Sequence, residues 1–259
     1  MTALPRFMVA PNGARLTKAD HPALPVTIEE TVACAVACHA AGADGLHAHV
    51  RDTEQRHVLD VGLYAELLTE LGHLAPDLYI QVTSEAAGTF TPAEQRHLVE
   101  TLKPHAVSVA LREIMAQQDA AVTRRFFATC AEAKIDVQHI LYDAADITHL
   151  SQLVAQGDVP RDGLKTLIVL GRYTSGQTST PEDVGALARR LKSDLPDADW
   201  AACAFGPQET ACLIEAMRHG GKARIGFENN RLNADGQVAA NNAERVIELL
   251  TQTKRAGFT

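Results

Sequence analysis

Residues 165–204 read KTLIVLGRYTSGQTSTPEDVGALARRLKSDLPDADWAACA, and this stretch decides the fold class. It begins with an apolar run rich in β-branched residues at 165–170 and ends with a second apolar run at 200–204. Between the two runs, residues 181–193 have the period of an amphipathic helix. A strand, a helix and a second strand in this order are typical of a parallel sheet.

The same alternation extends along the whole chain. The expected strands are residues 7–10, 45–50, 78–83, 106–111, 136–141, 165–170, 200–204 and 223–227, and the expected helices are 28–42, 60–74, 92–102, 116–133, 144–155, 181–193, 207–219 and 239–254. Eight such units in about 250 residues predict a closed α/β barrel, the (β/α)8 TIM barrel, and not an open doubly wound sheet. No linker rich in Pro, Gly or Ser interrupts the pattern, so we expect a single domain over residues 1–259.

Capping signals support this register of helices. Thr27-Ile-Glu-Glu30 and Thr91-Pro-Ala-Glu94 have the capping-box pattern, and Pro92 falls at the first helical position. Thr180-Pro-Glu-Asp183 is a third, weaker example.

Composition excludes several classes of function. Lys and Arg number 24 against 32 Asp and Glu, and this net charge of −8 argues against a nucleic-acid partner or a basic membrane-surface protein. No apolar run approaches the roughly 20 residues of a membrane span, and the N-terminal residues contain no signal-peptide stretch. Five cysteines without close CxxC pairs predict no disulfide framework. We therefore expect a cytoplasmic protein.

The second expected strand contains two histidines with metal-ligand spacing. It reads Gly45-Leu-His47-Ala-His49-Val-Arg51-Asp52, and residues two apart on a strand point to the same face. In a TIM barrel the active site lies at the carboxyl ends of the strands, so both imidazoles would point into that opening. The alternative is a pair of core histidines that are hydrogen-bonded to their neighbours.

A third ligand is expected from the end of the eighth strand. Glu228 follows residues 223–227, and strand 8 closes onto strand 1 beside strand 2, so its carboxylate could reach His47 and His49. Two imidazoles and one carboxylate with an open position are the pattern of a catalytic zinc site, although such sets also hold iron(II). The alternative for Glu228 is an ion pair with Arg51 or Arg224.

Polar residues also follow the other strands. They are Arg15 after strand 1, Thr83, Ser84 and Glu85 at strand 3, Ser108, Arg112 and Glu113 at strand 4, Asp143 after strand 5 and Arg172 after strand 6. Together they suggest an anionic, oxygen-rich substrate, although each alone is typical of a surface loop. The loop 171–177 is a candidate lid, with a flexible solvent loop as the alternative. The turn at 205–210 is a candidate phosphate site, with simple tight-turn geometry as the alternative.

Three blocks of this sequence resemble the β-keto acid cleavage enzymes, whose best-known type is the 3-keto-5-aminohexanoate cleavage enzyme. They are Pro11-Asn-Gly-Ala-Arg15, Leu46-His-Ala-His-Val-Arg-Asp52 and Arg224-Ile-Gly-Phe-Glu-Asn-Asn230. The order of segments agrees over essentially the whole chain. The resemblance implies a TIM barrel, a homotetramer and one divalent metal, typically zinc.

The resemblance also implies a reaction and a set of site residues. A β-keto acid and acetyl-CoA would give acetoacetate and a new acyl-CoA by a Claisen and a retro-Claisen step. His47, His49 and Glu228 would hold the metal. Arg224 would orient a water or the substrate carboxylate, and Thr83, Ser84 and Ser108 would contact the substrate.

Two departures from the family pattern shape our expectations. Asn229 stands where the family commonly has an aspartate that serves in proton transfer, and an amide cannot act as a carboxylate base. Either the substrate-bound metal acidifies the carbon enough by itself, or another acid serves, with Glu113 as our candidate for this catalytic role and Glu85 and Asp143 as further possibilities. Arg15 stands where relatives acting on an amine-bearing substrate have an acidic residue, so we expect a substrate tail that is not cationic, with Arg15 or Arg172 setting specificity.

Two other functions are compatible with these residues. One is a metal-dependent aldolase or hydrolase that acts on a keto or lactone substrate without CoA. The other, suggested by Asn229, is a catalytically inactive protein stabilised by its metal.

Overall fold

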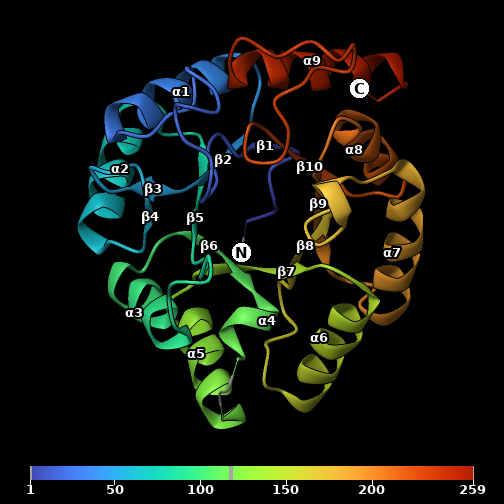
Figure 1. Cartoon of the computed structure of the whole chain (residues 1–259). Coiled ribbons are helices and arrows are strands. Elements are labelled where there is room, and N and C mark those ends of the chain that lie inside the picture. The colour runs from blue at the N-terminus through green and yellow to red at the C-terminus, as the bar shows by residue number, and fades with distance from the viewer. Residues whose placement is uncertain (1, 117–118, 259) are drawn as a thin grey trace.

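The computed structural model describes residues 2–116 and 119–258, and within them the chain forms a closed barrel of parallel strands (Figure 1). Around the barrel the strands follow the order β1 (Phe7–Val9), β10 (Lys222–Ile225), β9 (Asp199–Ala204), β8 (Lys165–Leu170), β7 (Asp136–Leu141), β6 (Ala106–Ala110), β5 (Tyr79–Thr83) and β2 (Gly45–Ala48). The predicted TIM barrel is therefore confirmed.

The helices form a ring outside the strands (Figure 1). They are α1 (Ile28–Ala40), α2 (Val61–Leu74), α3 (Pro92–Leu102), α4 (Leu111–Ile114), α5 (Ala120–Glu132), α6 (Ala144–Gln156), α7 (Pro181–Asp194), α8 (Glu209–Arg218) and α9 (Asn242–Arg255). Residues 117–118, near the start of the predicted helix 116–133, lie outside the described residues.

The predicted helix starts are confirmed by their caps. The Thr27 and Thr91 hydroxyls accept from the backbone N–H groups of Glu30 and Glu94, and the two glutamates accept from the N-cap backbone in return. At α7, the Asp183 carboxylate accepts from the Thr180 N–H at 2.8 Å. These reciprocal bonds satisfy backbone donors that a helix N-terminus leaves free, which fixes where each helix begins.

The barrel closes through β1, which pairs with β10 on one side and β2 on the other. Met8 is opposite Arg224 of β10 and Gly45 of β2 in this register. The ends of β2 and β10 therefore lie on either side of the first strand, although they are far apart in the sequence.

The predicted strand 45–50 is wrong at its carboxyl end. β2 stops at Ala48, and β3 (Val50–Arg51) pairs antiparallel with β4 (His57–Val58) as a separate hairpin. The Arg51 guanidinium donates to the carbonyl of Gln55 within this hairpin and to the carbonyl of Gly13 in the segment after β1, which holds the hairpin beside the opening of the barrel. The helix α4 is a second correction, since it begins at the last residue of the predicted strand 106–111.

Two main apolar regions and a small cluster of Leu24, Phe227 and Ala239 stabilise this architecture. The larger lies between the strands and the helices, and a smaller cluster of Leu4, Ala110, Ile140, Leu167, Val169, Ala201 and Cys203 fills part of the barrel interior.

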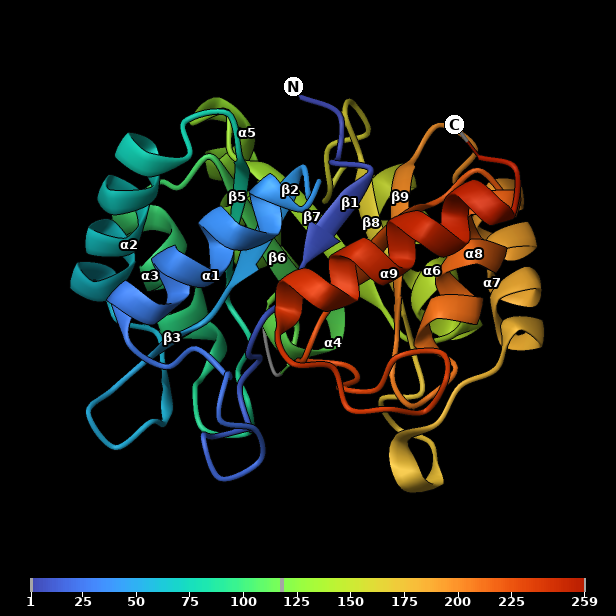
Figure 2. The same ribbon diagram turned by 90° about the horizontal axis from the view of Figure 1, so that it is seen from above.

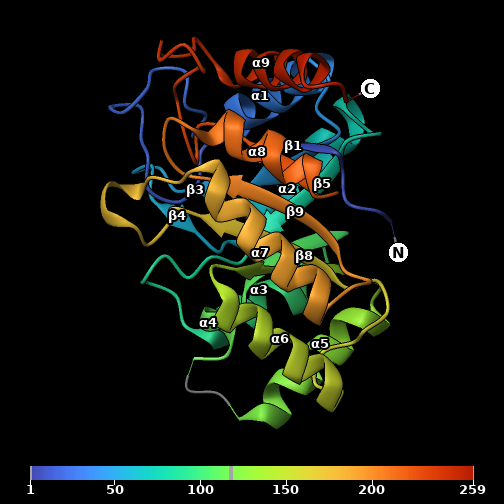
Figure 3. The same cartoon turned by 90° about the vertical axis from the view of Figure 1, so that its right-hand side faces the viewer.

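Figure 2 shows both termini at one end of the barrel and the loops that follow β2, β8 and β10 at the other. Figure 3 shows the β3–β4 hairpin and the loop after β8 on the same side of the molecule. Among the described residues, no helix has the length and apolar character needed to cross a membrane.

Candidate metal and substrate site

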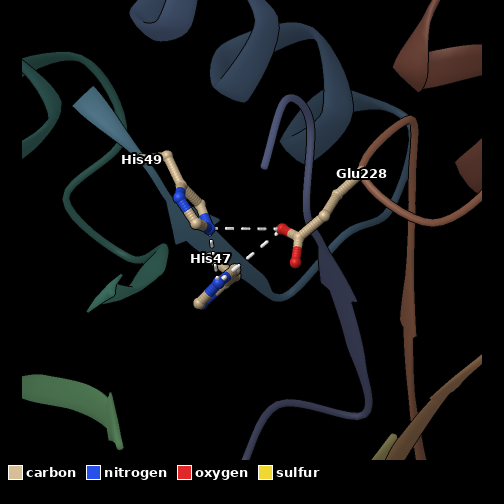
Figure 4. Close-up of side chains that lie close together, drawn as sticks. All are labelled: His47, His49 and Glu228. Atoms are coloured by element: carbon tan, nitrogen blue, oxygen red, sulfur yellow. Dashed lines mark hydrogen bonds and ion pairs between the residues drawn. The ribbon is translucent and has the colours of Figure 1, made fainter. Parts of the chain in front are cut away.

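His47, His49 and Glu228 meet at the carboxyl end of the barrel (Figure 4). The two Nε2 atoms are 3.2 Å apart. Oε2 of Glu228 lies 3.7 Å from Nε2 of His47 and 3.5 Å from Nε2 of His49. One ligand atom from each residue therefore points to a common centre, and the geometry brings together the three side chains that the sequence singled out as ligands.

This donor set fits a divalent ion of the size and preference of zinc. Zinc binds imidazole nitrogen and carboxylate oxygen at about 2.0–2.2 Å with tetrahedral angles, so neighbouring ligand atoms should be about 3.4 Å apart. The three observed separations, 3.2, 3.7 and 3.5 Å, lie close to that value. Both histidines are buried, and Glu228 also forms the ion pair with Arg224 that the sequence offered as its alternative, through its other oxygen at 3.1 Å.

Two glycines place the Glu228 side chain. Gly226 directly follows β10 and has a φ of 144°, and a Cβ there would lie 2.4 Å from the carbonyl oxygen of Ala10. Gly13 has a φ of 59°, and a Cβ there would lie 2.6 Å from Cγ of Glu228. The backbone approach at both positions requires the absence of a side chain. The predicted strand 223–227 consequently ends early, at Ile225, and turns Glu228 toward the histidines.

The surroundings favour the protonation states that a metal requires. Burial lowers the pKa of His47 well below its usual value, and the nearby Arg224 charge lowers it further. For Glu228, burial alone would raise the pKa, but Arg224 and the two imidazoles together hold it well below the usual range. A neutral imidazole and an ionised carboxylate are the forms that bind metal ions.

Arg224 lies beside this cluster with free donors. Its Nη2 donates to Oε1 of Glu228 at 3.1 Å and to Sγ of Cys203 at 3.2 Å. Its Nε and Nη1 are buried, and no described residue accepts a hydrogen bond from them. A guanidinium with unused donors at a cavity wall can bind a carboxylate.

A cavity at the carboxyl end of the barrel joins these groups. Its polar wall includes Arg15, His47, Thr83, Glu85, Arg172, Arg224 and Glu228, and its apolar wall includes Ala110, Ile140, Tyr142, Val169 and Phe205. Glu85 lies between the two other arginines, since its Oε1 is 3.7 Å from Arg15 and 3.5 Å from Arg172. Burial raises the pKa of Glu85, and the Glu228 carboxylate raises it further.

The remaining predicted site residues differ in their position relative to the cavity. Ser108 is opposite Thr83 in the sheet, and its hydroxyl is buried without a hydrogen bond to a described residue. Ser84 does not line the cavity, because its hydroxyl donates to the carbonyl of Ser108 at 2.9 Å. Asp143 accepts from backbone N–H groups at the start of α6 and pairs with Arg112.

Glu113 also lies outside the cavity wall. Its carboxylate accepts hydrogen bonds from the N–H of Ala86 at 2.8 Å and from Nε2 of Gln95 at 3.1 Å. Burial raises the pKa of Glu113, and the Glu85 carboxylate contributes to this shift. Its predicted catalytic role stays a prediction.

One neighbour of the metal cluster, a polar residue near the end of the third expected strand, was given no role by sequence reasoning. Gln81 of β5 lies opposite His47, and its Oε1 is 2.8 Å from Nδ1 of that histidine. The available signal was its position two residues before Thr83, which puts a polar side chain on the inward face of an otherwise apolar strand.

A model of the β-keto acid cleavage enzyme family matches residues 7–259, nearly the whole chain. The chain belongs to this family. It is 25% identical to the 3-keto-5-aminohexanoate cleavage enzyme of Fusobacterium nucleatum over 95% of this chain and 89% of that protein. It is also 25% identical to the 3-oxoadipate:acetyl-CoA acetyltransferase of Cupriavidus necator over 96% of this chain and 88% of that protein.

Solved structures agree with the family's barrel fold. The complex of ObcA with oxaloacetate has a TM-score of 0.70 at 14% identity and covers 92% of this chain, which spans 65% of the ObcA chain. The 3-dehydroquinate dehydratase of Clostridium difficile has a TM-score of 0.62 at 12% identity, covering 97% of this chain and 94% of that chain. At these identities the likeness shows the fold alone.

Proposed function

We propose that this protein is an acyltransferase that cleaves a β-keto acid with acetyl-CoA, giving acetoacetate and a new acyl-CoA. The observation that carries the proposal is the cluster of His47, His49 and Glu228 beside the free donors of Arg224, in a member of the β-keto acid cleavage enzyme family. Two relatives whose names specify acetyl-CoA transfer support the choice of co-substrate.

The proposed ligands are His47, His49 and Glu228, and zinc is the proposed metal because two imidazoles and one carboxylate leave an open position on it. When bound, the ion supplies Lewis acidity that stabilises negative charge on the oxygens of a 1,3-dicarbonyl unit. Arg224 donates its free N–H groups to the substrate carboxylate. Thr83 lines the cavity at the end of β5 and would contact the substrate, with Ser108 opposite it on β6. Ser84, also predicted to contact the substrate, would do so only after giving up its hydrogen bond to the carbonyl of Ser108.

The reaction needs a proton acceptor for the carbon between the two carbonyls. Glu85 supports this role because it lines the cavity and its Oε2 lies 4.0 Å from Nε2 of His49. Glu113, the acceptor predicted from the sequence, would have to release the N–H of Ala86 and turn into the cavity to accept this proton. Both carboxyls have a raised pKa, which favours proton uptake.

The bond changes balance without a further reagent. Once deprotonated, the carbon attacks the acetyl carbonyl, a carbon–carbon bond forms and the CoA thiolate leaves. The thiolate then attacks the original ketone. Cleavage of the bond between that ketone carbon and the former nucleophilic carbon gives the new acyl-CoA, and the returned proton completes acetoacetate.

Arg15 and Arg172 support a substrate whose tail is anionic. Together with Glu85 they give this part of the cavity one excess positive charge. A second carboxylate on the substrate could take the place of Glu85 as their partner. The relative named for 3-oxoadipate, a dicarboxylic keto acid, is consistent with this choice.

A turnover screen tests the proposed function. The purified protein is supplied with zinc and β-keto acids of cationic, neutral and anionic tail, with and without acetyl-CoA, and acetoacetate is followed. We expect acetoacetate only with acetyl-CoA and most rapidly with an anionic tail. Cleavage without acetyl-CoA would instead identify the aldolase or hydrolase, and full metal loading with no turnover would identify the inactive relative.

The proposal includes an assembly and a location. We expect residues 1–259 to act as one catalytic domain within a cytoplasmic homotetramer. Light scattering of the purified protein measures the oligomeric state.

A further inference from the structure

A row of buried amide side chains crosses the barrel interior from His47 to β8. Nδ1 of His47 is 2.8 Å from Oε1 of Gln81, whose Nε2 donates to Oε1 of Gln138 at 2.9 Å. Nε2 of Gln138 donates in turn to the main-chain carbonyl of Thr166 at 3.1 Å. All four residues are at most 1% exposed, so water does not compete for these groups.

The last group in the row sets the direction of every bond before it. A carbonyl can only accept, so the amide nitrogen of Gln138 must face Thr166 and its oxygen must face Gln81. The nitrogen of Gln81 must then face Gln138, which leaves the oxygen of Gln81 toward His47. That oxygen can only accept, and Nδ1 of His47 must therefore carry the hydrogen.

This tautomer is the one that metal binding through Nε2 requires. A neutral imidazole with its hydrogen on Nδ1 has its lone pair on Nε2. Nε2 is the atom that lies 3.2 Å from Nε2 of His49 and 3.7 Å from Oε2 of Glu228. A hydrogen on Nε2 would occupy the ligand position.

We propose that Gln138, which touches neither metal ligands nor the cavity, is a positioning residue that fixes the tautomer of His47 through Gln81. Gln81 alone does not fix the direction, because an amide can turn over and offer its nitrogen to Nδ1. Gln138 removes that choice because its own orientation is set by a backbone group. The inference rests on the proposed metal site. It adds the direction of the hydrogen bonds that leave Nε2 of His47 free to bind the ion.

The first test measures zinc affinity by competition with a chromophoric chelator in wild type and variants. Gln138→Leu should weaken zinc binding about 10- to 100-fold, as loss of such supporting hydrogen bonds typically does. Leu167→Val, which trims the same interior at a residue that donates no side-chain hydrogen bond to the row, is the matched control and should leave the affinity within about threefold. Equal losses in both variants would overturn the proposal in favour of general loosening of the barrel.

Rescue separates tautomer control from packing. A carboxylate at position 81 can only accept, so it keeps the hydrogen on Nδ1 without help from Gln138. The double variant Gln81→Glu with Gln138→Leu should therefore regain most of the affinity that Gln138→Leu loses. Failure to regain it would overturn the proposal.

A spectroscopic measurement tests whether Gln138 sets the tautomer of His47 even if the protein binds no zinc. Absence of zinc binding would contradict the proposed function but leave this measurement valid. Long-range nitrogen–proton NMR of ¹⁵N-histidine-labelled, chelator-treated protein reports which nitrogen of His47 carries the hydrogen. We expect Nδ1 in wild type and a substantial Nε2 form in Gln138→Leu. The same tautomer in both proteins would overturn the inference.

Discussion

The two oxygens of Glu228 are divided between Arg224 and the imidazole pair. Oε1 accepts from Nη2 of Arg224 at 3.1 Å, whereas Oε2 faces the Nε2 atoms of His47 and His49. The Glu228 carboxylate therefore connects the Arg224 guanidinium, which would bind substrate, to the two histidines, which would bind metal. Changes at Arg224 should affect substrate use and the orientation of Glu228 together.

Replacing Arg224 by methionine should lower kcat/KM by about 100- to 1,000-fold, because the buried donors for the substrate carboxylate are lost. Steady-state kinetics with acetyl-CoA and a β-keto acid measure the change. Metal content at saturating zinc, determined by elemental analysis, should persist because both histidines and the glutamate remain, although Glu228 loses the partner of its Oε1. Unchanged kinetics in a folded, metal-loaded variant would contradict the role of Arg224.

Gly13→Ala should weaken zinc binding at least about tenfold, since the added Cβ would lie 2.6 Å from Cγ of Glu228 and displace the ligand. Gly157→Ala is the matched control, because Gly157 also has positive φ, 75°, but nothing lies within 4 Å of its added Cβ. Both variants should lose about 1–2 kcal/mol of unfolding free energy from the left-handed backbone. Only Gly13→Ala should lose metal affinity, measured by chelator competition.

Arg172→Met should lower kcat/KM for a dicarboxylic β-keto acid about 10- to 100-fold, the value of a hydrogen bond to a charged group. Activity on a β-keto acid with a neutral tail should change much less, because that tail makes no such bond. The ratio of the two values in wild type and variant is the measurement. A uniform loss on both substrates would show that Arg172 does not select the tail.

Glu85→Gln should reduce kcat by about 100-fold or more if Glu85 accepts the proton. Glu113→Gln keeps the shape of a side chain outside the cavity wall, so we expect a smaller loss. Exchange of substrate hydrogen with deuterated solvent follows the proton step directly. A larger defect in the Glu113 variant would restore Glu113 as the acceptor predicted from the sequence.

His139 should make the unfolding free energy fall below neutral pH. Burial lowers its pKa to about 4, from 6.5 in the unfolded chain, so between these values the unfolded state binds more protons. Stability is therefore fully present above pH 6.5 and declines as the pH falls toward 4. Between pH 7.5 and 5 wild type should lose about 2 kcal/mol more than His139→Leu in urea unfolding. Parallel pH profiles would contradict this assignment.

Sequence pattern predicted those elements whose signal is local. The expected strands 136–141 and 165–170 coincide with β7 and β8, because each is a short run rich in buried apolar residues between two segments of helical period. The alternation of runs and helical segments was enough for the barrel, and His47 and His49 could be paired because strand geometry alone puts them on one face.

The sequence could not predict features that depend on contacts across the fold. The hairpin after Ala48 is held by a bond from Arg51 to the carbonyl of Gly13, a residue far away in the sequence. Ser84 and Glu113 follow strand ends, where no period fixes the side-chain direction, and both turn to neighbouring backbone. The link from His47 to Gln138 joins three strands, so no local window contains it.

The placement of β1 between β2 and β10 has a consequence for the order of folding and metal binding. His47 of β2 and Glu228, which follows β10, become neighbours only after the barrel has closed through β1. An ion bound to both residues would therefore link the first and last parts of the chain. Nascent or partly opened molecules would lack the complete ligand set. Metal would then bind only after the barrel has closed, and loss of the metal would accompany the first step of barrel unfolding.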